Sequence, residues 1–130
     1  MRLPSLLVLL AAALSFGCSS PSAFSPCSGD VTVSVVRLNP PKISWEPGCG
    51  VDILVVEDGA ARTMWSIRSG RGENTLVPPI TYGVPGGAIE EFSPQQFQHG
   101  NGYVVRLYRL KRESDGTQLG LLAGQGNFRW

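Results

Sequence analysis

A chain of 130 residues has room for one domain, since single domains typically contain roughly 100 to 200 residues. Its 16 glycines and 10 prolines favour short strands joined by turns over long helices. The formal charge is only +1, so there is no electrostatic case for binding nucleic acid or an anionic membrane face, and we expect no nucleic-acid partner.

The N-terminal segment predicts an export signal. Arg2 supplies one positive charge, and an apolar run follows from Leu6 to Leu14. This run is too short to span a bilayer, which takes about 20 helical residues. We therefore expect it to direct export and not to remain as a membrane helix.

The residues after this run resemble the lipobox of bacterial lipoproteins. Leu14-Ser15-Phe16 leads to the small residue Gly17, directly before Cys18. The resemblance implies a signal peptide over residues 1–17 and a Cys18 that carries a diacylglycerol and an amide-linked acyl chain, which together anchor a protein stably. Ser15 departs from the leucine usual in the family. A cut by the ordinary signal peptidase near Ser20 or Ala23, giving a soluble secreted domain, therefore remains the alternative.

The segment after Cys18 predicts a tether. Ser19 resembles the residue that follows the cysteine in lipoproteins sent to an outer membrane, so the resemblance implies that location where the organism has such a membrane. Residues 18–28 are rich in serine and proline, and eight extended residues reach on the order of 25 Å. We expect a single domain over residues 29–130, close to the membrane surface.

The remaining cysteines predict a disulfide. With Cys18 taken by lipid, Cys27 and Cys49 form an even pair in an exported chain. A metal site is the alternative, but His99 is the only histidine and no Cys-x-x-Cys sequence occurs. We therefore expect a Cys27–Cys49 bridge, with no metal and no cofactor.

The first half of the domain predicts two strands and a hairpin. Residues 31–36 alternate in polarity and stop before two prolines, and residues 42–46 place Ile43 and Trp45 on one face. Residues 51–57 and 62–68 flank an Asp-Gly turn signal, which is typical of a hairpin.

The second half predicts loops followed by long strands. Residues 75–77 form a candidate short strand, and the segment 78–102 reads as loop with edge strands because proline and glycine recur in it. Residues 103–110 give the clearest strand, with Tyr103, Val105 and Leu107 on one face. A last strand is expected between residues 118 and 130.

Two segments resemble fibronectin type III domains. They are ISWEP, at residues 43–47, and GNGYVVRLYRL, at residues 100–110. The resemblance implies an all-β fold, a single small antiparallel β-sandwich of the immunoglobulin-like kind. It makes Trp45 the core tryptophan and Tyr103 a buried tyrosine whose hydroxyl bonds the backbone of the preceding loop. The expected core thus contains Trp45, Tyr103, Val105 and Leu107.

Catalytic patterns in the sequence are weak. His99 lies in a polar loop without a nucleophile motif, and Glu90 and Glu91 point to opposite faces if they lie on a strand. We therefore expect no enzyme. The preferred hypothesis is a lipid-anchored envelope protein whose β-sandwich binds or assembles with an envelope protein or polysaccharide.

Two further alternatives remain open. The first is an enzyme or enzyme accessory subunit that uses acidic residues of the 78–102 loop, which requires Glu90 and Glu91 to lie in a concave pocket. The second is a structural lipoprotein that docks through an apolar patch, for which Trp65 and Tyr108 are the candidate binding surface.

Overall fold

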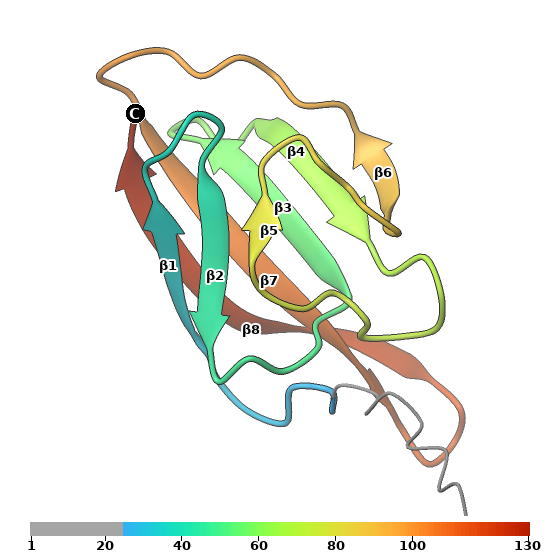
Figure 1. The fold of residues 1–130 in the computed structure, drawn as a ribbon. Coiled ribbons are helices and arrows are strands. Elements are labelled where there is room, and N and C mark those ends of the chain that lie inside the picture. Colours follow the sequence, from blue (N-terminus) through green and yellow to red (C-terminus); the bar gives the residue numbers. More distant parts are fainter. Residues whose placement is uncertain (1–24) are drawn as a thin grey trace, which may run out of the picture.

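A computed structural model describes residues 25–130, so the predicted signal peptide over 1–17 and the lipidation site Cys18 lie outside the described residues. Within residues 25–130 the chain forms strands and no helix, in two antiparallel sheets of three and five strands. Figure 1 shows the smaller sheet lying across the larger one. The all-β prediction is confirmed.

The strands follow the sequence pattern closely. The three-stranded sheet has the order β1-β2-β5, and the five-stranded sheet has the order β6-β4-β3-β7-β8. The short strands β5 and β6 both lie at sheet edges, as the proline-rich segment predicted. The bounds are β1 (Thr32–Val36), β2 (Lys42–Glu46), β3 (Ile53–Asp58), β4 (Thr63–Arg68), β5 (Ile80–Thr81), β6 (Ile89–Phe92), β7 (Gly102–Arg112) and β8 (Gln118–Arg129).

The core lies between the two sheets. Strand β2 contributes Trp45, which is 1% exposed, and β7 contributes Tyr103, Val105 and Leu107, all buried. These positions alternate with exposed or half-buried ones, as expected for strands with one face on a core. The indole N–H of Trp45 donates to the carbonyl oxygen of Cys49 at 2.8 Å. All four residues expected in the core are thus buried.

The position of Trp65 differs from the prediction. It is fully buried on β4, on the same face as Ile67, and its indole N–H donates to a carboxylate oxygen of Glu90 at 2.9 Å. The prediction that Trp65 contributes to an exposed binding surface is therefore wrong. Trp65 and Ile67 lie on the inner face of β4, because they stand opposite the buried residues Val56 and Leu54 of the neighbouring strand β3.

The predicted disulfide between Cys27 and Cys49 is present. Backbone pairing continues beside it: the N–H of Cys27 donates to the carbonyl of Gly50 at 2.8 Å, and the N–H of Gly50 donates to that of Ser25 at 2.9 Å. Residues 25–28 were expected in the tether, but these bonds attach them to the domain. The packed domain therefore begins before residue 29.

A buried polar cluster fixes the turn that follows β4. The side chain of Asn74 donates to the carbonyl of Leu110 and accepts its N–H, both at 2.9 Å, while the N–H of Asn74 donates to Asp52. The strand expected over residues 75–77 is reduced to one bridge, Leu76 with Val51. Two prolines follow directly and have no N–H to extend a ladder.

Strand β1, at the edge of the three-stranded sheet, lies in close contact with β8, at the edge of the five-stranded sheet. The N–H of Val31 donates to the carbonyl of Ala123 at 2.8 Å. A Cβ atom at the neighbouring Gly124 would lie only 2.5 Å from the carbonyl oxygen of Val31. Glycine at position 124 therefore permits the close approach of the two strands.

Gly124→Ala should lower the free energy of unfolding by about 1 to 3 kcal/mol, because the added methyl group displaces the backbone of Val31. Urea denaturation measures this change. Gly120→Ala is the matched control, since it lies on the same strand and a Cβ there meets nothing within 4 Å. Equal losses for the two variants would contradict the proposed close contact.

Candidate functional site

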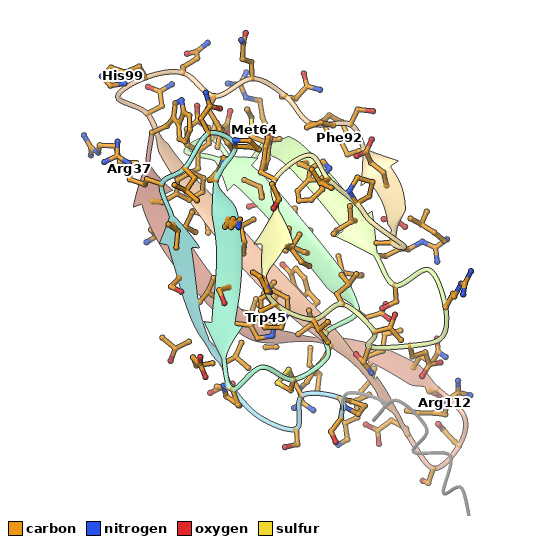
Figure 2. The ribbon with its side chains drawn as sticks, viewed as in Figure 1. Arg37, Trp45, Met64, Phe92, His99 and Arg112 are labelled. Atoms are coloured by element: carbon orange, nitrogen blue, oxygen red, sulfur yellow. A yellow bond between two sulfur atoms is a disulfide. The ribbon has the colours of Figure 1, made fainter. Side chains whose placement is uncertain are left out.

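The two ends of the fold differ in the loops that they carry. Ser25 pairs with Gly50 at one end. The β3–β4 turn and the long segment 93–101 between β6 and β7 lie at the other, which we call the distal end (Figure 1). Figure 2 shows Met64 and Phe92 at the distal end and Arg112 at the opposite one.

A pocket of about 600 Å³ opens at the distal end. Its walls come from the end of β3, the β3–β4 turn, the start of β4, the last residue of β6, the segment 93–101 and the start of β7. This volume lies in the range of small-molecule sites, roughly 300 to 1,000 Å³. The lining residues are Asp58, Arg62, Thr63, Met64, Phe92, Gln95, Gln96, Gln98, Asn101 and Tyr103.

Two tyrosine hydroxyls hold the segment 93–101 in place. The hydroxyl of Tyr103 accepts the N–H of Gln98 at 2.7 Å, which is the kind of hydrogen bond that the fibronectin type III resemblance implies. The hydroxyl of Tyr82 accepts the N–H of Gln95 at 3.1 Å and lies 2.7 Å from the carbonyl oxygen of the same residue. The two hydroxyls thus hold the backbone of a segment that has no regular secondary structure.

Phe97 inserts its ring beneath this segment. Its centroid lies 4.3 Å from that of Tyr82, 4.6 Å from that of Tyr103 and 5.3 Å from that of Trp130. Aromatic pairs at these distances contribute about 0.5 to 1.5 kcal/mol each beyond their buried area. Phe97 is not among the residues expected in the core, although a single ring within the polar run Gln-Gln-Phe-Gln is a usable signal of burial.

Trp130 closes the same region. Its N–H donates to the carbonyl of Asn101 at 3.0 Å, and its carbonyl accepts the N–H of Gly100 at 2.7 Å. The last strand is therefore joined by its backbone to the end of the segment that forms the pocket.

Hydrogen bonds and burial shift the pKa values of Asp58 and Tyr82 at the distal end. The N–H of Arg62 donates to the carboxylate of Asp58 and lowers its pKa; the Arg62 guanidinium and the N–H of Ala60 act in the same direction, while burial opposes them. Burial raises the pKa of Tyr82 to about 12, against the opposing effect of the Gln95 N–H. Asp58 thus stays charged and Tyr82 neutral near pH 7.

The acidic pair expected for the enzyme alternative diverges. The carboxylate of Glu90 accepts the indole N–H of Trp65, while that of Glu91 pairs with Arg68. Both glutamates are exposed, and neither is among the residues that line the distal pocket. His99 is also exposed and does not line this pocket. The concave acidic site required by that alternative is not formed by Glu90 and Glu91.

Tyr108 lies on the other face of the five-stranded sheet from the core. It is half-buried and pairs with Ile53 on β3 and with Leu122 on β8, which is 47% exposed. It therefore belongs to an apolar row on the outer sheet face and is separate from the distal pocket. Its role in binding stays a prediction.

Residues 25–130 contain no group of three or more histidine, cysteine or acidic side chains placed to hold a metal ion. In the same range no helix is long and apolar enough to cross a membrane. Comparison of the chain with protein-family models, with curated proteins and with solved structures gives no match.

Proposed function

We propose that this protein is an exported lipoprotein of the cell envelope, anchored through Cys18, that presents a non-catalytic β-sandwich of the fibronectin type III kind as a binding module. The observation that carries the binding role is the position of the pocket. The pocket opens at the distal end. The described part of the chain begins at the opposite end of the fold (Figure 1). A domain tethered by its N-terminal end then presents the pocket away from the membrane.

Two features support the anchored, exported form. The residues between Cys18 and Ser25 reach at most about 25 Å when extended, which keeps the domain near the membrane surface. The disulfide between Cys27 and Cys49 is typical of proteins outside the reducing cytosol.

The sandwich type is supported by two residues at the expected places. Trp45 is buried on the second strand, and Tyr103 stands near the start of the penultimate strand with its hydroxyl bonded to the loop before it. The chain also passes repeatedly from one sheet to the other, from β2 to β3 and from β4 to β5. Such crossings are typical of immunoglobulin-like sandwiches.

Intact mass spectrometry of the protein extracted from membranes tests the anchored form. We expect a mature chain that begins at Cys18 and carries acyl mass, and that gains the mass of two hydrogen atoms on reduction. Cys18→Ser is the control and should leave the protein unlipidated and out of the membrane fraction. An unlipidated native chain, cut near Ser20 or Ala23, would overturn the anchored form and leave a soluble secreted binding domain.

A further inference from the structure

The charges that line the distal pocket are already paired. Asp58 and Arg62 are the charged residues among its described lining, and Nη2 of Arg62 lies 2.7 Å from Oδ2 of Asp58. The remaining lining side chains carry amides, two hydroxyls, a thioether and aromatic rings. The Arg62 side chain is 80% exposed, so an anionic ligand would have to compete with Asp58 for its guanidinium, and a cationic ligand would have to compete with Arg62 for the carboxylate. The pocket therefore favours a neutral ligand.

Side-chain amides dominate the polar part of the lining. Gln95, Gln96, Gln98 and Asn101 each combine a carbonyl acceptor with two N–H donors. The side-chain amide of Asn101 donates to the side-chain oxygen Oε1 of Gln98 at 3.1 Å, which uses only part of the hydrogen-bonding capacity of either group. Hydroxyl groups also donate and accept, so a ligand with several hydroxyls matches this surface better than one that only accepts.

Phe92 supplies an apolar surface beside these amides. Its side chain remains 43% exposed at the end of the edge strand β6, and it lines the pocket together with Met64. Figure 2 shows both residues at the distal end. An exposed ring next to hydrogen-bonding groups is suited to a molecule with one apolar face and a polar rim.

The wall that carries the amides is fixed before any ligand arrives. Tyr82 and Tyr103 hold its backbone, and Phe97 fills the space beneath it. A rigid wall loses little conformational entropy on binding, which favours even a ligand that makes mainly hydrogen bonds.

From these features we infer that the distal pocket binds a neutral saccharide. The ring of Phe92 lies against the C–H face of one sugar, and the amides of the 93–101 segment bond its hydroxyls. This inference rests on the proposed binding role of the pocket and adds the chemical class of its ligand.

Isothermal titration calorimetry of the full chain, purified in a detergent without a sugar headgroup, tests the inference. The probes are maltohexaose, cellohexaose, mannohexaose and chitohexaose, with an oligogalacturonate as the acidic counterpart. We expect at least one neutral hexasaccharide to bind, and Phe92→Ala to weaken its binding about tenfold by removing the stacking surface. Phe92→Trp should retain binding.

Ile89→Ala is the matched control. Ile89 lies on the same edge strand and is 42% exposed, close to the 43% of Phe92, but it does not line the pocket. Its substitution should change the affinity less than twofold, because the side chain does not reach the ligand. Thermal melts of both variants establish that each remains folded.

The outcomes distinguish a failure of the neutral saccharide as ligand from a failure of the proposed binding role. Binding of the acidic oligosaccharide alone, lost in Phe92→Ala, would overturn the neutral saccharide and leave the pocket as a binding site. The neutral class is also overturned if no neutral hexasaccharide binds, or if Ile89→Ala weakens binding as much as Phe92→Ala. Lipidation at Cys18 is measured separately by mass.

Discussion

Replacing Trp45 with alanine should lower the free energy of unfolding by about 3 to 5 kcal/mol. The indole is 1% exposed and lies between the two sheets, so its removal leaves a cavity that the surrounding strands fill only in part. The carbonyl of Cys49 also loses the hydrogen bond from the indole N–H. Denaturation by urea, followed by the fluorescence of the remaining tryptophans, measures the change.

His99→Ala provides the comparison for this substitution. The histidine is exposed in the segment 93–101, and its removal should change stability by less than about 0.5 kcal/mol. Similar losses for Trp45→Ala and His99→Ala would contradict the position of Trp45 in the core.

Removing the disulfide should lower the free energy of unfolding by about 3 kcal/mol, according to the chain-entropy model. The bridge joins residues with a sequence separation of 22, and it links the residues before β1 to those after β2. Without it, the unfolded chain regains the freedom of that loop. The double variant Cys27→Ala/Cys49→Ala, compared with the unaltered protein in urea, measures the loss.

Chemical reduction of the disulfide measures its contribution to stability independently. A reducing agent should lower the stability of the unaltered protein to about that of the double variant and leave the double variant unchanged. If both proteins unfold at the same urea concentration without reductant, the bridge does not stabilise the domain.

Much of the strand pattern could be predicted because one face of each strand lies on the core. The alternation in residues 31–36, 42–46 and 103–110 reports directly which side chains point inwards. The Asp-Gly turn after β3 likewise depends on neighbouring residues, since the carboxylate of Asp58 accepts the N–H groups of Ala60 and Arg62. Interactions of this short range can be read from sequence.

The pocket could not be predicted, because the contacts that build it join distant segments. Tyr82 lies in the chain before β6, yet its hydroxyl holds Gln95 after that strand. Asn74 in the same way bonds Leu110, at a separation of 36 residues. The burial of Trp65 could not be predicted for a related reason, since its hydrogen-bond partner Glu90 is 25 residues away. Local alternation places a ring on one face but does not show what covers it.

The backbone bonds of Trp130 determine where a label can be attached. Asn101, which accepts its N–H, lines the distal pocket, so any group joined after Trp130 starts beside the ligand. A bulky affinity tag at that position would compete for the space of the pocket. A small fluorophore after Trp130 would instead act as a reporter, with its emission changing as the pocket fills.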